Sequence, residues 1–330
     1  MKAIRLPATG GPEVLRYEDI PAPVAGPGQV LVRAHTIGVG KPDALWRSGK
    51  YRWLPPLPAT PGIEMTGTIE GMGPGVPSKF PDLAVGQMAL VYALNGGCYA
   101  EYVAVPATDV VALPTGIDLE GAVCIPNYLV AYALIHRATG QLPGRSVYVN
   151  GAGGGMGSAL IQLCKSEGRT VIAGASTAEK CAFARDQGAD HAINYAAENA
   201  RDRVLEMTAG LGVELVLDQL GGPKFIENLD MLADLGMVVS FNALAGVPEE
   251  NLFKELRARL PRSPAVRCFT MHSYDRDPAG RRALTERVIS LFAAKTIRPH
   301  ITQRLPLAEA RRAHELIDAG AVMGKLVLKP

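Results

Sequence analysis

The sequence predicts an α/β protein in which a compact, largely antiparallel β unit precedes a doubly wound parallel sheet. The chain has 330 residues, which exceeds the usual size of one compact core. Before about residue 113, short strand patterns alternate with Gly-Pro, Pro-Gly and Pro-Pro turns. From about residue 121 the chain alternates between helix and strand patterns. Two domains of different architecture are therefore expected.

Composition and charge narrow the class of protein. The chain is 48% hydrophobic and 20% charged, with a net charge of +2, which is typical of a globular protein and gives no reason to expect nucleic acid or an anionic membrane as the main partner. The N-terminus lacks the apolar core of a signal peptide, and the longest apolar region, 122–135, is too short to span a bilayer. Five scattered cysteines without a Cys-x-x-Cys pair favour buried free thiols over a metal cage. We expect a cytoplasmic protein.

Hydrophobic periodicity places the individual elements. In the first part of the chain, strands are expected at 29–34, 65–69 and 88–92. In the second part we expect a helix around 128–138, a strand from 146, a helix from about 157, and strands at 170–174, 191–195, 213–218, 237–241 and 265–270. The chain should end with a helix at 281–294, a turn, a helix at 307–319 and a strand at 325–328. This tail is expected to return to the first domain.

The second part is organised around a glycine loop between a buried strand and a helix. Residues 152–157 fit the dinucleotide fingerprint, with Ala152 where the first glycine usually stands. Small residues allow a tight turn and a close approach of backbone to pyrophosphate, and the helix N-terminus offers free N–H groups. Gly154, Gly155 and Met156 are therefore candidate cofactor contacts. The alternative is a merely flexible loop.

Other candidates lie where parallel strands end, because α/β folds bind ligands in the crevice at the carboxyl ends of their strands. Asn150, Phe241, Asn242 and Phe269 lie at the ends of three of the expected strands. Leu220 follows another, at 213–218, and joins this set. The alternative is that these side chains only pack at the end of the sheet. This alternative is stronger for the phenylalanines than for Asn242.

The segment after the second parallel strand predicts which nicotinamide is bound. Folds that bind NAD place Asp or Glu about 20 residues past the glycines, where it holds the ribose 2′-hydroxyl. Here the strand ends in 173–177 without a carboxylate. Ser176, Lys180 and Tyr195 could supply the hydroxyls and the cation that a 2′-phosphate needs, so NADPH is expected. An ordinary solvated helix lysine is the alternative for Lys180.

From these motifs the chain resembles the medium-chain dehydrogenase/reductase superfamily, and within it the zinc-independent quinone oxidoreductases of the zeta-crystallin type. The resemblance runs nearly end to end and rests on the glycine loop and on the segments 10–15, 60–64, 97–102, 188–190, 218–222 and 324–328. It implies a GroES-like catalytic domain at 1–121, completed by 296–330, a Rossmann NADPH-binding domain at 122–295, and a homodimer. In similar quinone reductases, a lysine and a tyrosine matching Lys180 and Tyr195 contact the 2′-phosphate.

Zinc-dependent relatives bind a catalytic zinc through a cysteine in an early loop and a histidine in a Gly-His-Glu turn. This chain has Gly40 in that loop and Ile63 in place of the histidine. Zinc needs about four N, S or O ligands, so no metal site is expected. Without a Lewis acid an alkoxide is poorly stabilised, which disfavours alcohol oxidation and favours hydride addition to an electron-poor acceptor.

Tyr51 matches a tyrosine that relatives place near the nicotinamide, and its phenol could donate a hydrogen bond or a proton to the reduced acceptor. A packed aromatic side chain is the alternative. Lys41, Val130 and Lys325 complete the expected cofactor contacts. Many quinone reductases carry asparagine at Gly40, and relatives often carry threonine at Val130. Because of these two departures, the substrate preference of the related quinone reductases cannot simply be assigned to this chain.

Taken together, the residues and the resemblance predict an NADPH-dependent, zinc-independent reductase of quinones or α,β-unsaturated carbonyls. A 2-enoyl thioester reductase is the nearest alternative, suggested by Asn150 and Tyr51. A further alternative is an NADPH-binding protein without turnover.

Overall fold

The computed structural model describes residues 1–140 and 142–330, which form two compact units. Unit 1 comprises residues 1–126, 278–295 and 299–330, and unit 2 comprises 127–277 and 296–298. Compactness therefore places the segment 278–295 with unit 1, whereas the sequence-based division places it in the nucleotide-binding domain. That division stays a prediction. Within the described residues, no helix is both long enough and apolar enough to cross a bilayer.

Unit 1 is built on a mostly antiparallel sheet of the kind that the turn-rich first part of the sequence predicts. Its seven strands follow the order β14-β15-β3-β4-β5-β7, with β6 also paired to β3, and a separate pair joins β1 to β2. The strands are β1 Lys2–Arg5, β2 Arg16–Asp19, β3 Gln29–Val39, β4 Glu64–Met72, β5 Met88–Tyr92, β6 Tyr102–Pro106, β7 Val110–Ala112, β14 Ile301–Pro306 and β15 Lys325–Lys329. Alternating side chains of β3, β4 and β5 enter one hydrophobic core.

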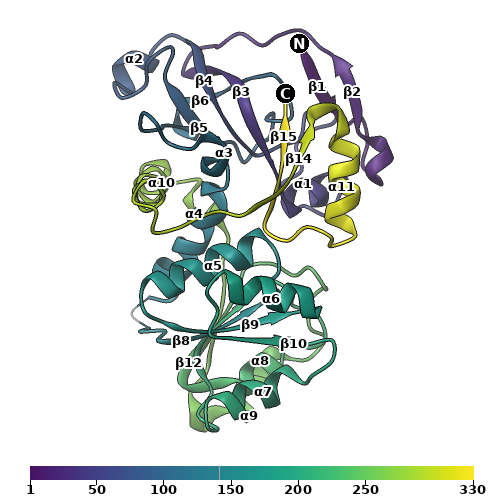
Figure 1. Cartoon of the computed structure of the whole chain (residues 1–330), viewed down its shortest axis with the longest axis vertical. Helices are drawn as coiled ribbons and strands as arrows, with labels where there is room; N and C mark the ends of the chain where they lie inside the picture. The colour runs from purple at the N-terminus through teal and green to yellow at the C-terminus, as the bar shows by residue number, and fades with distance from the viewer. Residues whose placement is uncertain (141) are drawn as a thin grey trace. The chain divides into compact units, whose positions relative to one another are not determined.

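The C-terminal tail completes this sheet, as predicted. β15 pairs antiparallel with β3, so that Val327 lies opposite Gly38, and Figure 1 shows the yellow tail beside the purple first strands. β14 is a strand where only a turn was expected. It pairs parallel with β15 at the edge of the sheet, and this position lets it carry polar, exposed residues such as Thr302 and Arg304 in place of a hydrophobic run.

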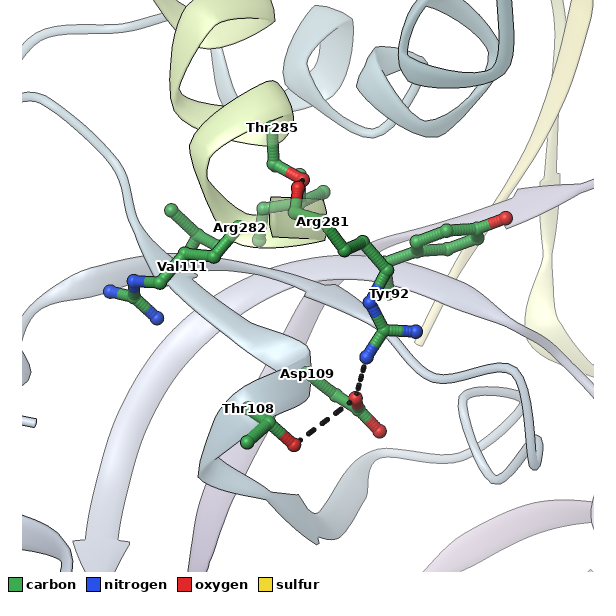
Figure 2. A pocket seen from close by; sticks show the side chains of 8 residues that line it. Tyr92, Thr108, Asp109, Val111, Arg281, Arg282 and Thr285 are labelled. Atoms are coloured by element: carbon green, nitrogen blue, oxygen red, sulfur yellow. Dashed lines mark hydrogen bonds and ion pairs between the residues drawn. The ribbon is translucent and has the colours of Figure 1, made fainter. Parts of the chain in front are cut away.

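Several helices, most of them short, pack around the sheet of unit 1. The α-helices are α1 Lys41–Arg47, α2 Val76–Lys79, α3 Leu119–Ala122, α10 Pro278–Ala293 and α11 Ala310–Asp318, and the 3₁₀ turns are η1 Pro12–Val14, η2 Ala107–Asp109 and η6 Leu307–Glu309. Helix α10 is held by two arginines that help to line a small pocket (Figure 2). Arg281 pairs with Asp109 at 2.5 Å, and Arg282 donates to the carbonyl oxygen of Val110 at 2.7 Å. These bonds explain why α10 belongs to unit 1.

Unit 2 is the doubly wound sheet that the alternating pattern predicts. Six parallel strands follow the order β10-β9-β8-β11-β12-β13, which is the Rossmann order. The strands are β8 Ser146–Asn150, β9 Thr170–Ala175, β10 His191–Asn194, β11 Val213–Asp218, β12 Leu232–Ser240 and β13 Ala265–Cys268. Four of the free cysteines are buried, but Cys268, at the end of edge strand β13, is exposed, contrary to expectation.

Helices cover both faces of this sheet, with α5 and α6 on one face and α7, α8 and α9 on the other (Figure 1). The α-helices are α4 Ile125–Ala133, α5 Gly155–Ser166, α6 Ala178–Asp186, α7 Ala200–Met207, α8 Glu227–Asp230 and α9 Leu252–Ala258. A π-helical turn, η3 Leu134–Ala138, continues α4, and 3₁₀ turns lie at η4 Leu260–Arg262 and η5 Met271–Tyr274. The strand-helix alternation therefore brings the carboxyl ends of all six strands to one edge of the sheet.

Candidate active site

The glycine loop joins β8 to α5 in the arrangement that the fingerprint requires. Gly151 adopts a φ of 79°, which favours glycine, and Gly157 packs so closely on the backbone of Ala152 that an added Cβ would overlap it. At Gly154, an added Cβ would meet nothing within 4 Å. Gly154 is the N-cap of α5 and has no side chain to cap the first N–H groups. The loop therefore leaves open space beside a helix N-terminus of positive potential.

At the centre of the sheet, Asp218 ties the ends of β8 and β11 together. The Nδ2 of Asn150 donates to Asp218 Oδ1 at 2.8 Å, and the backbone N–H of Gly221 donates to Oδ2 at 2.9 Å. Burial raises the pKa of Asp218. Gln219 donates from Nε2 to the carbonyl oxygen of Gly151 at 2.5 Å, so the segment containing Leu220 is fixed to the glycine loop. Asn150 is thereby oriented at the point where the chain connections reverse direction, which is where such sheets bind ligands.

The three residues expected at a 2′-phosphate lie together beyond the ends of β9 and β10. Lys180 Nζ lies 3.4 Å from Ser176 Oγ, and Ser176 also hydrogen-bonds the Tyr195 hydroxyl. The methylene chain of Lys180 lies against Gly153, where an added Cβ would approach it to about 3 Å or less. Thr177 caps α6 by accepting from the N–H of Lys180, which fixes the start of that helix. An ammonium and two hydroxyls are thus gathered beside the glycine loop.

The remaining candidates of unit 2 are half-buried and lie near the other strand ends. The N–H of Phe241 donates to the carbonyl oxygen of Asp218 at 3.0 Å, and the N–H of Phe269 donates to the carbonyl oxygen of Ser240 at 2.9 Å. Ser240 Oγ in turn donates to the carbonyl oxygen of Asn242 at 3.3 Å. Val130 lies on α4. Their contact with a cofactor stays a prediction.

In unit 1, helix α1 carries Lys41 at its first position and positions Tyr51 just beyond its end. The N–H of Tyr51 donates to the carbonyl oxygen of Leu45 at 3.2 Å. The Tyr51 ring lies between two tryptophans, with its centroid 6.2 Å from that of the buried Trp46 and 5.6 Å from that of the exposed Trp53. Tyr51 is half-buried, so packing and a functional role are both compatible with its position.

Lys325 is buried, and its ammonium forms an ion pair with the buried carboxylate of Glu64. A second buried carboxylate, that of Asp43, accepts the N–H of Gly40 at 2.8 Å through Oδ2. Burial, with repulsion from Glu64, raises the pKa of Asp43 to about 7. The role of Lys325 as a cofactor contact stays a prediction.

This buried cluster is what sequence reasoning missed. Glu64 lies in the segment 60–64 that carries the family resemblance, and the sequence predicted no functional role for Glu64 or Asp43. Glu64 and Lys325 are 261 residues apart, so no local pattern pairs them. Among the described residues, no group of three or more His, Cys, Asp or Glu side chains is arranged to hold a metal ion.

A further buried pair adjoins the cluster. The Tyr99 hydroxyl interacts with the Asp43 carboxyl and lies 3.2 Å from Nε2 of His314 on α11. Burial, with the nearby Arg47 guanidinium, lowers the pKa of His314 to about 3, so this histidine is neutral at physiological pH. The neutral ring adds no charge to balance the two carboxylates.

Comparison with known proteins identifies the family. Residues 26–115 match the alcohol dehydrogenase GroES-like domain, and residues 187–328 match the zinc-binding dehydrogenase family. A quinone oxidoreductase from Pseudomonas aeruginosa is 34% identical over 333 residues, covering 100% of this chain and 99% of the relative. The chain belongs to the quinone oxidoreductase family of the medium-chain dehydrogenase/reductase superfamily.

Two further proteins of the superfamily are similar to this chain, one in sequence and one in structure. A 2-haloacrylate reductase from a Burkholderia species is 30% identical, covering 97% of this chain and 96% of the relative. The structure of an Escherichia coli quinone oxidoreductase complexed with NADPH is 28% identical, with a TM-score of 0.91 and complete coverage of both chains. The GroES-like and Rossmann architecture predicted from sequence is thus confirmed, and so is the family resemblance.

The raised pKa of Asp43 predicts a pH-dependent stability that Asp43→Asn removes. The folded protein holds a proton that the unfolded chain, with a pKa near 3.8, releases at lower pH, so wild-type stability falls as pH rises from about 4 to about 7. The free energy of unfolding of the variant, relative to that of wild type, should increase by on the order of a few kcal/mol between pH 4 and pH 7. Above pH 7 this difference should change little. Urea denaturation of both proteins between pH 4 and 9 measures this difference. Parallel curves would show that Asp43 titrates normally.

Proposed function

We propose that this protein is an NADPH-dependent, zinc-independent reductase that transfers hydride to a quinone or an α,β-unsaturated carbonyl. The observation that carries the cofactor assignment is the grouping of Ser176, Lys180 and Tyr195 beside the glycine loop. No carboxylate occupies the end of β9, where it would repel a 2′-phosphate. The E. coli relative of this fold holds NADPH, which supports the same choice here.

The residues of unit 2 fit the parts of this cofactor in order. The N-terminus of α5 at Gly154, Gly155 and Met156 would hold the pyrophosphate. Asn150 and Leu220, at the ends of the central strands, are proposed to contact the nicotinamide side of the cofactor. The open space beside Gly154 is the cradle that a larger residue would fill. Phe241, Asn242, Phe269 and Val130 are proposed to complete the contacts from this unit, and Lys41 and Lys325 those from unit 1.

The acceptor class follows from the chemistry of the side chains and from the relatives. Glycine at position 40 and isoleucine at position 63 offer no metal-ligating side chain, so stabilisation of an alkoxide by zinc has no support here. One relative reduces quinones by name and another reduces 2-haloacrylate, and both substrates contain a carbon–carbon double bond conjugated to a carbonyl or carboxyl group. An electron-poor conjugated acceptor is therefore the substrate class proposed.

When bound, NADPH supplies the hydride, and the protein's own part is to orient the acceptor and to stabilise the anion that it becomes. Tyr51 is proposed to donate a hydrogen bond from its phenol to the oxygen of that anion, or to transfer the proton that completes the reduction. Its packing between Trp46 and Trp53 suits this task, because a donor that is already oriented needs little reorganisation during the reaction. We further propose that the protein acts as a homodimer, as its resemblance to quinone oxidoreductases implies, and that it is cytoplasmic, as expected from its sequence.

Lys180→Ala should weaken NADPH binding about tenfold or more while leaving NADH binding little changed. The lost contact is a charged hydrogen bond to the 2′-phosphate, worth roughly 1.5 to 3 kcal/mol. Isothermal titration of wild type and variant with both cofactors measures the change. Lys254→Ala, which removes an exposed lysine of α9 in the same unit, is the control and should bind both cofactors as wild type does. Equal affinity of wild type for NADPH and NADH would refute the assignment.

Tyr51→Phe should slow reduction of enones on the order of a hundredfold, and reduction of quinones far less. Hydride addition to a quinone gives a delocalised anion, whereas an enone gives a more basic enolate that depends more on the phenol donor. Steady-state kinetics with both acceptor classes, and with an enoyl thioester as a third, measures the difference. Tyr17→Phe, at an exposed tyrosine of β2, is the control. An equally small loss on every acceptor would return Tyr51 to a packing role.

Exhaustive chelation should leave the turnover rate unchanged, because the positions that bind zinc in zinc-dependent relatives carry no ligand in this chain. The test compares NADPH oxidation before and after dialysis against a strong chelator, with metal content measured on the same samples. Loss of activity that zinc restores would contradict the proposal.

A further inference from the structure

Two glycines lie two residues apart where β3 ends and α1 begins, and packing requires only the first of them. At Gly38, in β3, an added Cβ would overlap the side chain of Glu64, so this glycine makes room for the carboxylate that pairs with Lys325. At Gly40 the atom nearest to an added Cβ would be Cδ of Pro42, at 3.3 Å, a contact that a small shift relieves. Packing therefore tolerates a side chain at position 40.

The backbone does not require glycine at this position either. Gly40 has a φ of −137° and a ψ of 171°, which is extended backbone that any residue adopts. It is the N-cap of α1, where serine or asparagine stabilises a helix at least as well as glycine does. Glycine also gives the unfolded chain extra conformational freedom. Local physics thus favours a side chain here, and a residue that departs from local preference is expected at a functional site.

The space that a side chain at position 40 would occupy adjoins two buried polar groups. An added Cβ would lie 3.7 Å from Nζ of Lys325 and 3.7 Å from Oδ2 of Asp43. Lys325 is 4% exposed and Asp43 is fully buried, whereas Gly40 itself is half-buried. Because the side chain is missing, an atom that takes the place of the Cβ approaches both polar groups.

These neighbours suit an oxygen atom better than a hydrocarbon. An ammonium offers N–H donors, and an oxygen placed one bond beyond the position of the Cβ can reach hydrogen-bond distance of Nζ. An alkyl group in the same place would keep water away from the ammonium and the carboxyl without returning a hydrogen bond, which is costly. The space at Gly40 therefore favours an oxygen-bearing group.

Position 40 belongs to the part of unit 1 that the proposed reaction uses. Gly40 directly precedes Lys41, and the last turn of α1 holds Tyr51 through the carbonyl oxygen of Leu45. The family resemblance points to the same place, because zinc-dependent relatives bind their catalytic zinc from this loop and many quinone reductases carry asparagine at this position. A group of the acceptor is thus the natural occupant of the space.

We propose that Gly40 determines the specificity for the acceptor: the space left by its missing side chain is a subsite, beside Lys325 and Asp43, for an oxygen-bearing substituent next to the double bond that is reduced. This inference rests on the proposed function and names the substrate class of the same site. Quinones and enones with an alkoxy or hydroxy group at that place are preferred over those with an alkyl group of the same size. A serine or an asparagine at position 40 fills the subsite.

The test uses three 1,4-benzoquinones, which carry a methoxy group, an ethyl group or no substituent at carbon 2. The methoxy and ethyl groups are similar in size, and each quinone is compared between wild type and variant, so that its intrinsic reactivity cancels. In Gly40→Ser and Gly40→Asn, the ratio of kcat/KM for the methoxy quinone to that for the unsubstituted quinone should fall about tenfold, a loss typical of one hydrogen bond. The same ratio for the ethyl quinone should fall far less, because the ethyl group forms no hydrogen bond in wild type.

Gly71→Ser is the matched control. Gly71 lies in β4 of the same unit, and an added Cβ there would make an ordinary contact with Leu31 at 3.8 Å, so this variant should keep both ratios of wild type. Thermal unfolding provides a readout without turnover. The Tm of Gly40→Ser should equal or exceed that of wild type, whereas Gly38→Ala, whose Cβ overlaps Glu64, should unfold at a lower temperature.

The possible failures are distinguishable. A fall in the Tm of Gly40→Ser as large as that of Gly38→Ala would mean that packing requires Gly40, and the inference would be overturned. Unchanged ratios in Gly40→Ser, or an equal fall for the methoxy and ethyl quinones, would overturn the subsite for an oxygen-bearing substituent. A wild-type protein that reduces none of the three quinones and no enone would overturn the proposed function instead, and the Tm values would still decide whether the fold needs glycine at position 40.

Discussion

The hydrogen bond between Asn150 and Asp218 joins the two central strands of unit 2 at the point where the chain connections reverse direction. The surrounding loops depend on it. Asp218 also accepts from the N–H of Gly221, and Gln219 reaches back to the glycine loop at Gly151. One buried carboxylate therefore fixes the relative positions of two loops that come from distant parts of the chain. The edge of the sheet at which a nucleotide would bind is shaped before any ligand arrives, and preorganisation of this kind reduces the entropy lost on binding.

Sequence alone predicted this half of the site because its signals are local. The glycine loop lies between a β-branched strand and a helix of regular apolar spacing, and the packing of Gly157 on Ala152 shows the steric reason for glycine there. Lys180 follows the end of β9 by a single turn of helix, so sequence spacing brought it to Ser176. Placement of Tyr195 needed only the parallel pairing of β10 with β9.

The unit 1 cluster could not be predicted in the same way. The pairing of Glu64 with Lys325 depends on the return of the tail to β3, which sets the register but leaves no periodic signal in either segment. Edge strand β14 was missed for a related reason, since an edge strand needs no hydrophobic run. Compactness joins α10 to unit 1 through Arg281 and Arg282, and contacts of charged side chains across long sequence separations are likewise invisible to periodicity.

Asp43 and Asp218 do similar physical work in the two units, because each carboxyl fixes a loop through the N–H of a glycine. Each is buried, each has a raised pKa because of burial, and each accepts a glycine N–H at a loop. Asp218 uses both oxygens, one on Asn150 and one on Gly221, so donors compensate its charge from two sides. Asp43 accepts the N–H of Gly40 and interacts with the Tyr99 hydroxyl, but it also has a second carboxylate nearby, that of Glu64. Burial raises the pKa of both carboxyls, and at Asp43 repulsion from Glu64 raises it further.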